Sequence, residues 1–112
     1  MLEAEYNELN KFTIQASEAI ADYNDRFNDL TSKDKKYIIE KILAYLDIVL
    51  VFTMNIRHQI LQQLATSPNA IRIQLNQHLS ELKVTVETTK TLSFNYTTIL
   101  NSIRDDLKND VL

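Results

Sequence analysis

The chain has 112 residues, enough for one domain with a single buried core and too few for two. Hydrophobic residues make up 45% and charged residues 24%, a balance typical of globular proteins and unlike that of disordered or fibrous chains. The sequence contains no glycine, one proline and no cysteine, so it lacks the usual residues of tight hairpins, phosphate-binding loops, disulfides and thiolate metal sites. This composition favours long helices joined by few turns.

The first predicted helix covers residues 2–30. Apolar residues recur there at alternating spacings of four and three, a heptad seam interrupted only by Thr13. Phe12, Ile14 and Ala19 widen the seam on its flanks, which predicts that this helix packs against two neighbours. A very short turn is expected to follow it.

The second predicted helix covers residues 32–65. Thr31 is followed three residues later by Asp34, a pattern typical of a capped helix start. Helical projection predicts one narrow face in water, formed by Lys33, Lys36, Glu40, Ala44, Asp47, Val51, Asn55, His58 and Gln62. On the opposite face, the projection predicts core positions at Ile38, Ile42, Tyr45, Leu46, Val49, Ile56, Ile60 and Leu64.

The third predicted helix begins at Pro68, with Ser67 as its N-cap, and continues its apolar seam to Leu107. Residues 85–98 contain six threonines and a serine, which are weak helix formers. A break near residues 88–93 therefore stays open as an alternative. The expected fold is all-α: one domain over residues 1–112, an antiparallel bundle of three long helices, or four if the third breaks.

Motifs for chemistry are scarce. His58 and His78 fall on different helices without the Glu-x-x-His spacing of a helical-bundle metal site, so we expect surface histidines. A glycine-flanked nucleophile and phosphate-binding glycine motifs are absent from the sequence. We expect no catalytic residues, no cofactor, no metal and no small-molecule substrate, and hence a protein that is not an enzyme.

A membrane span is not expected either. The most apolar stretch, Ile42 to Phe52, has 11 residues interrupted by Asp47, and crossing a bilayer needs about 20. The first residues are acidic where a secretory or mitochondrial presequence is basic. These features predict a cytoplasmic protein.

Charge is distributed unevenly along the chain, although the total is only −3. Residues 1–31 carry two bases against seven acids, and residues 32–67 carry five bases against three acids. The basic cluster after the first turn consists of Lys33, Lys35, Lys36 and Lys41. The favoured interpretation is that these lysines neutralise Asp22, Asp25 and Asp29 across the turn; the alternative is contact with an acidic partner or a phosphate backbone.

One side of the second predicted helix forms a candidate protein interface. Leu43, Leu50, Met54 and Leu61 fall within about 40° of one another by helical projection. They form either the second seam of the core or an exposed apolar strip with Asp47 and Arg57 on its rim. We expect Asp47 to be solvated and not buried, because it shares the outward face with Glu40 and His58.

Two functions fit this sequence. The leading hypothesis is a non-catalytic interaction or assembly protein that contacts another protein or itself, as a subunit or small regulator of a larger complex. The alternative is a small all-helical accessory subunit of a nucleoprotein complex. Such subunits of CRISPR effector complexes are similar in size and helical content, a likeness of architecture alone. Alignment of five bases on one face would favour nucleic acid: Arg57, Arg72, Lys83, Lys90 and Arg104.

Overall fold

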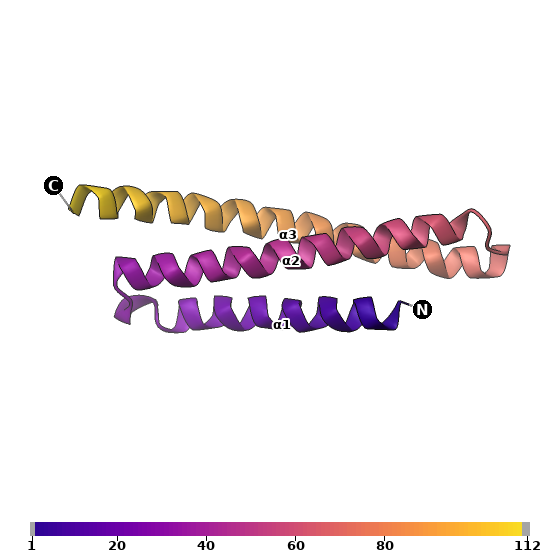
Figure 1. The fold of residues 1–112 in the computed structure, drawn as a ribbon, viewed down its shortest axis with the longest axis horizontal. Helices are drawn as coiled ribbons and strands as arrows, with labels where there is room; N and C mark the ends of the chain where they lie inside the picture. The colour runs from indigo at the N-terminus through magenta and orange to yellow at the C-terminus, as the bar shows by residue number, and fades with distance from the viewer. Residues whose placement is uncertain (1, 111–112) are drawn as a thin grey trace.

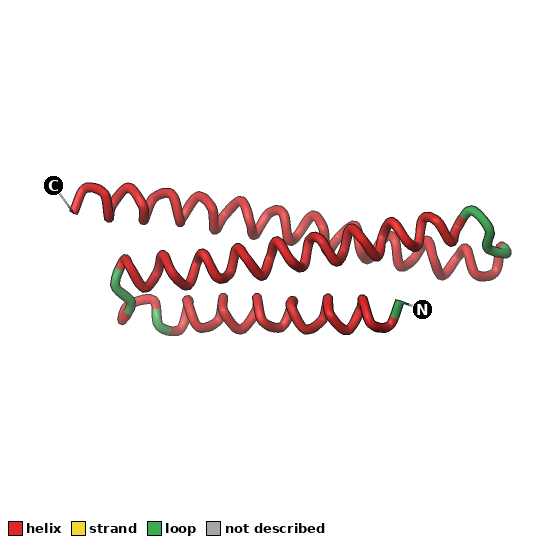
Figure 2. Tube along the Cα trace, in the orientation of Figure 1, coloured by secondary structure: helices red, strands yellow, loops and turns green. Residues whose placement is uncertain are grey.

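A computed structural model describes residues 2–110 of the chain. It contains three long helices, α1 (Glu3–Asp25), α2 (Ser32–Leu64) and α3 (Asn69–Asp110), and a single 3-10 turn, η1 (Phe27–Asp29). Helix covers nearly all of the described chain (Figure 2). The predicted all-α bundle is confirmed.

The three helices form an elongated bundle in which α2 packs against both α1 and α3, and α2 lies between them in the view of Figure 1. The Cα atoms of the bundle extend over 65 × 20 × 16 Å. Both outer helices run antiparallel to α2 and pack chiefly on it. Helix α1 reaches α3 as well, since the rings of Tyr23 and Tyr96 lie 6.2 Å apart in an edge-to-face arrangement. Because α1 is the shortest helix, α2 and α3 continue beyond its N-terminus as a two-helix hairpin (Figure 1).

The first connection is longer than the sequence predicted. Helix α1 ends at Asp25 and not at residue 30. The backbone N–H of Arg26 donates to the carbonyl of Asp22 at this end, and η1 follows. Residues 24–29 include two asparagines and two aspartates, weak helix formers, and the sequence offers no glycine for a left-handed cap. The predicted cap of α2 is confirmed, because the hydroxyl of Thr31 accepts from the backbone N–H of Asp34 at 3.1 Å.

The second connection corrects the predicted N-cap of α3. Ser67 does not cap α3; its hydroxyl donates to the carbonyl of Gln63, 2.7 Å away, and satisfies the C-terminus of α2. Pro68 lies just outside the helix, and its carbonyl accepts the first hydrogen bonds of α3, from Ile71 and Arg72. Pro68 suits this position because its missing N–H would have no partner there.

Helix α3 is continuous, so the bundle has three helices and not four. Four of the six threonines that raised the possibility of a break donate hydrogen bonds to carbonyls of their own helix. The hydroxyl of Thr89 donates to the carbonyl of Thr85 at 2.7 Å, and that of Thr85 to Glu81 at 3.2 Å. Hydroxyls bonded in this i−4 pattern no longer compete with the helical backbone bonds.

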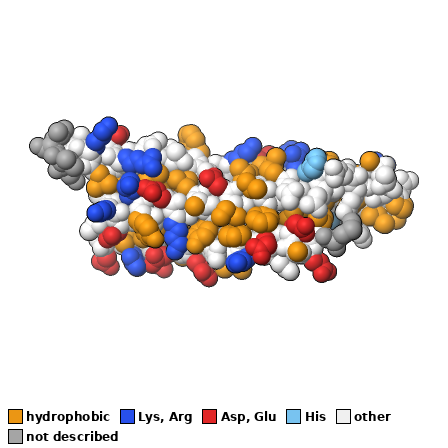
Figure 3. All heavy atoms as spheres, in the orientation of Figure 1, with side chains coloured by type: hydrophobic (Ala, Val, Ile, Leu, Met, Phe, Trp, Pro, Cys, Tyr) orange, Lys and Arg blue, Asp and Glu red, His pale blue; other side chains and the backbone are white. Residues whose placement is uncertain are grey.

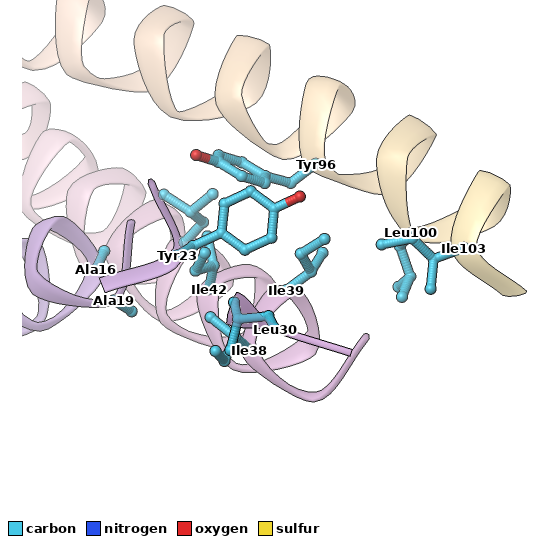
Figure 4. Packing of buried hydrophobic residues seen from close by; sticks show 11 residues of the cluster. Ala16, Ala19, Tyr23, Leu30, Ile38, Ile39, Ile42, Tyr96, Leu100 and Ile103 are labelled. Atoms are coloured by element: carbon cyan, nitrogen blue, oxygen red, sulfur yellow. The ribbon is translucent and has the colours of Figure 1, made fainter. Parts of the chain in front are cut away.

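The core divides into two clusters along the long axis of the bundle. One lies toward the first connection and takes residues from all three helices: Ala16, Ala19, Tyr23, Leu30, Ile38, Ile39, Ile42, Leu46, Tyr96, Leu100 and Ile103 (Figure 4). The other lies toward the second connection and consists of Leu9, Val49, Ile56, Ile60, Leu75 and Leu82. Most predicted core positions are confirmed, and the structure adds Ile39 and Thr53, both fully buried. Thr53 is tolerated there because its hydroxyl donates to the carbonyl of Val49 at 2.7 Å.

Candidate functional site

The predicted side face of α2 is divided between core and surface. Leu43 packs against the first core cluster, and Leu50 is half-buried. Met54 and Leu61 are 41% and 45% exposed. The face therefore changes from a seam into an accessible apolar surface along its length.

Leu61 and Arg57 open onto a cleft between α2 and α3. The cleft has a volume of about 260 Å³. Its residues are Arg57, Leu61, Asn76, Leu79, Ser80 and Lys83. Apolar side chains from two helices thus meet beside one base from each helix.

The contribution of α3 to this cleft was missed from the sequence. In an antiparallel helical hairpin, residues equally distant from the turn lie opposite each other. Counting from the turn at residues 65–68 places Asn76 opposite Arg57, and so brings Leu79 and Lys83 to the same region. The antiparallel register of the hairpin carries this signal, and the apolar pattern within α2 alone does not.

The predicted outward face of α2 is confirmed. Asp47 is exposed, as are Glu40 and His58 on the same stripe. Val51 is 67% exposed on this stripe although it lies within the most apolar part of the helix. Asp47 is thus solvated and needs no buried partner.

Three of the four lysines of the first connection, Lys35, Lys36 and Lys41, lie near a carboxylate or an aromatic ring. Lys36 Nζ lies 3.2 Å from Glu40 Oε1, and Arg104 Nη2 of α3 lies 4.0 Å from the same oxygen. Lys35 Nζ sits 3.7 Å from the ring centroid of Phe27, and Lys41 Nζ lies 5.9 Å from that of Tyr45.

The acids before the turn do not pair directly with these lysines. Asp22 Oδ1 instead lies 3.6 Å from Arg26 Nε within the first helix and turn. Within residues 2–110, no ion pair joins Asp22, Asp25 or Asp29 to Lys33, Lys35, Lys36 or Lys41. The two clusters therefore form no contact ion pairs across the turn within the described residues, and their mutual neutralisation stays a prediction.

A wide polar cleft of about 510 Å³ separates α1 from α2 near this connection. Its charged residues are Glu18, Asp22, Arg26, Asp34 and Lys41. Both signs are present, so the cleft favours neither a strong anion nor a strong cation. Across the described residues 2–110, no group of three or more His, Asp or Glu side chains is arranged to hold a metal ion.

The bases of α3 follow one side of that helix. By helical projection, Arg72, Lys83 and Lys90 lie within about 20° of one another. Arg104 adjoins α2 through Glu40, and Arg57 of α2 shares the cleft with Lys83. In Figure 3, Lys and Arg gather over α3 along the upper edge, and Asp and Glu gather over α1 along the lower edge.

Both histidines are exposed surface residues. His58 Nε2 lies 3.3 Å from Gln62 Nε2 on the next turn. His78 Nδ1 lies 3.7 Å from Glu81 Oε2, and the ring of Tyr6 lies 6.5 Å from that of His78. Burial and the nearby Glu81 carboxylate raise the pKa of the Tyr6 phenol.

Comparison with protein families, with curated proteins and with solved structures finds no match. None of the helices within residues 2–110 combines the length and the apolar character that crossing a membrane requires.

Proposed function

We propose that this chain is a non-catalytic helical interaction protein, which acts through protein–protein contacts as a subunit or small regulator of a larger complex. The cleft between α2 and α3 carries the proposal. Leu61 and Leu79 offer an apolar floor there, Met54 extends the apolar surface along α2, and Arg57 and Lys83 supply the rim. Accessible apolar side chains surrounded by charged groups are typical of docking surfaces.

The cleft fits an amphipathic helix that carries apolar anchors and acidic flanks. Helix-in-groove recognition uses apolar anchors three, four or seven residues apart, and Met54 and Leu61 are seven residues apart on α2. Carboxylates of such a partner would complement Arg57 and Lys83. Exposed rim charges set orientation and association rate more than affinity, so the apolar contacts at Leu61 and Met54 supply most of the binding free energy.

The proposal is tested by capture of partners on the tagged chain in its native cells, with quantitative mass spectrometry. Leu61→Asp places a carboxylate in the cleft and should lower recovery of the captured partner at least about tenfold. Val51→Asp is the matched control, because Val51 is exposed on the outward face of α2 away from the cleft.

Circular dichroism and thermal unfolding of both variants establish that they remain folded. Equal recovery of the same partners by Leu61→Asp and Val51→Asp would contradict the cleft as the docking surface. Loss of binding in both variants would also contradict it, because the effect would then have no relation to the cleft. The absence of cysteine suits a reducing compartment, and the proposed location is the cytoplasm.

A second candidate function is contact with a nucleic-acid backbone, favoured by the alignment of bases along α3. The combined change of Lys83→Glu and Lys90→Glu should abolish a salt-dependent mobility shift of labelled single-stranded RNA or DNA. Lys11→Glu on the acidic helix α1 is the control. Failure of the unchanged protein to bind either nucleic acid at low salt would exclude this function and leave the protein interaction ahead.

A further inference from the structure

The bases of α3 share one side of the helix. They are Arg72, Lys83, Lys90, Arg104 and Lys108, and each is exposed. Helical projection places all of them within about 40° of the direction of Arg72. Lys83, Lys90 and Arg104 are also separated by multiples of seven residues, a spacing that keeps side chains on one face of a supercoiled helix. We call this set of bases the basic stripe.

The basic stripe borders α2 at two points. Lys83 lines the cleft that also contains Arg57 of α2, so the cleft adds a base to the stripe. Arg104 Nη2 lies 4.0 Å from Glu40 Oε1, and Lys36 Nζ lies 3.2 Å from the same oxygen. Because Glu40 is shared between two bases, it does not cancel the positive charge of the stripe.

Few acids lie beside the basic stripe on α3 itself. Glu81 and Asp106 project about 160–180° from Arg72, on the opposite side of the helix. Glu87 and Asp105 project about 60° from it, next to the stripe. No ion pair within residues 2–110 joins Glu87 or Asp105 to a base. The stripe therefore keeps a local excess of positive charge, although the whole chain is acidic.

An exposed aromatic ring lies within the basic stripe. Phe94 follows Lys90 at the i+4 spacing of neighbouring side chains on a helix. Phe94 is 72% exposed. Within residues 2–110, no other ring packs on Phe94 and no cation lies over it, whereas Lys35 covers the ring of Phe27. Both faces of a large apolar ring are thus in water beside a line of bases.

Single-stranded nucleic acid matches both the bases and the ring. Its phosphates complement a line of lysines and arginines, and its unpaired bases stack on exposed aromatic side chains. A duplex or an acidic peptide would complement the positive charge alone. From Arg72 to Lys108 the stripe extends about 54 Å at 1.5 Å per residue, so several phosphates of one strand can contact it together.

We propose that the basic stripe of α3 binds single-stranded nucleic acid, with phosphates on the lysines and arginines and one base stacked on Phe94. This inference goes beyond the protein contact at the cleft and rests on the second candidate function, whose substrate class it names. Asn76, Thr97 and Asn101 project along the same side of α3, are exposed, and supply uncharged hydrogen-bond donors. Recognition is independent of sequence, because phosphate contacts and stacking accept every base.

Fluorescence anisotropy with labelled oligouridylate and oligothymidylate tests the proposal. Phe94→Leu keeps an apolar side chain without the ring, and it should weaken binding about tenfold with the salt dependence unchanged. Phe94→Tyr keeps the ring and should bind within about twofold of the unchanged protein. Lys90→Gln should weaken binding and make the slope of log K against log salt less steep by about 0.7. Binding of either oligonucleotide supports the proposal, and the tighter one identifies the preferred sugar.

Tyr37→Leu is the matched control for the ring. Tyr37 is 71% exposed and lies on α2 among the lysines of the first connection, outside the basic stripe. Its replacement should leave binding unchanged. The chain has no tryptophan, so Phe94→Trp and Tyr37→Trp each report on one position. Stacking predicts that the oligonucleotide quenches tryptophan fluorescence at position 94 and not at position 37.

Three results would overturn the proposal. The first is equal affinity of Phe94→Leu and the unchanged protein, and the second is equal quenching at positions 94 and 37. The third is binding of duplex DNA or polyglutamate as tight as that of the single strand, because the first would show recognition of charge alone and the second a preference for neither phosphate nor base. Circular dichroism of each variant establishes that these comparisons are made on folded protein.

These results are separable from the tests of the proposed functions. If Lys83→Glu with Lys90→Glu abolishes binding and Phe94→Leu does not weaken it, the backbone contact holds and the stacking fails. If neither oligonucleotide binds and Leu61→Asp loses its partner, the protein contact at the cleft holds and the nucleic-acid site fails.

Discussion

The two ends of the bundle differ in the number of helices that meet there. At the end near the first connection, three helices meet, and Ile39 and Ile42 are completely buried beneath Tyr23 and Tyr96 (Figure 4). At the other end, α2 and α3 continue alone, and Ile73 stays 72% exposed (Figure 1). The comparison shows that an isoleucine is core or surface according to the side of its helix on which it lies, because Ile60 near the second connection is 1% exposed while Ile73 lies on the outer side of α3. Apolar side chains are therefore buried at both ends.

The largest contrast is expected from truncating one isoleucine at each end. Ile39→Ala leaves a cavity among three helices and should lower the free energy of unfolding by about 3 kcal/mol. Ile73→Ala removes a side chain from the exposed outer surface of α3 and should change it by less than about 0.5 kcal/mol. Urea denaturation monitored by circular dichroism measures both. Similar losses at the two positions would show that Ile73 is packed as well as Ile39.

An intermediate effect is expected at Leu50, on the part of α2 where the side face passes from seam to surface. Leu50→Asp puts a carboxylate at a half-buried position and should lower the free energy of unfolding by about 1–3 kcal/mol without unfolding the chain. Thermal unfolding by circular dichroism provides the measurement. An unfolded variant would assign Leu50 to the core seam, and an unchanged melting temperature would assign it wholly to the surface.

A smaller effect is expected from the charges at the three-helix end. Replacing Lys33, Lys35 and Lys36 by glutamate should lower the free energy of unfolding by about 1 kcal/mol or less, because exposed charges are weakly coupled. Part of the loss should come from Lys35, which lies over the Phe27 ring. High salt should reduce the difference between variant and unchanged protein. Loss of partner or nucleic-acid binding with unchanged stability would instead assign the lysines to an interface.

The tyrosines of the three-helix end are expected to have the smallest effect on the free energy of unfolding at neutral pH. Burial raises the pKa of Tyr23, with a further contribution from Tyr96, and burial also raises the pKa of Tyr96. The folded state therefore holds these phenolic protons more tightly than the unfolded chain does. The contribution of these phenols to the free energy of unfolding is fully present below the unfolded pKa of about 10, and it is lost as pH rises through the folded pKa values.

The combined change of Tyr23→Phe and Tyr96→Phe tests this pH dependence. The double variant should show a smaller decrease in melting temperature above about pH 10 than the unchanged protein. Thermal unfolding over a series of alkaline buffers measures the slope. An identical slope in both proteins would show that the two phenols do not control alkaline unfolding.

The helical pattern of the sequence predicted the fold because each helix carries its own apolar period. Ile42, Ile56 and Ile60 were identified as core residues by spacing alone, and all are fully or almost fully buried. Ile39 was missed because its burial depends on the third helix, which spacing within α2 does not reveal. The end of α1 was misplaced because a polar stretch can continue as helix or tighten into a 3-10 turn with similar free energy.

The candidate site was only partly predictable for the same reason. The pattern of one helix predicted Leu61 and Arg57 as candidate interface residues. Predicting their neighbours Leu79 and Lys83 requires the antiparallel register of two helices. A groove of about 320 Å³ between α1 and α3, above Leu46 and Val49 of α2, depends on the arrangement of all three helices. Properties of one helix were readable from the sequence, and properties of helix pairs and triplets needed the structure.

The central claim is that the cleft beside the two-helix end contacts another protein. Site-specific photo-cross-linking in native cells tests it most directly, with p-benzoylphenylalanine placed either at Leu61 in the cleft or at Val51 on the outward face of α2. The account predicts cross-linked species with a second, different protein from position 61 and little or none from position 51. Cross-links of equal yield from both positions, or from position 51 alone, would contradict it.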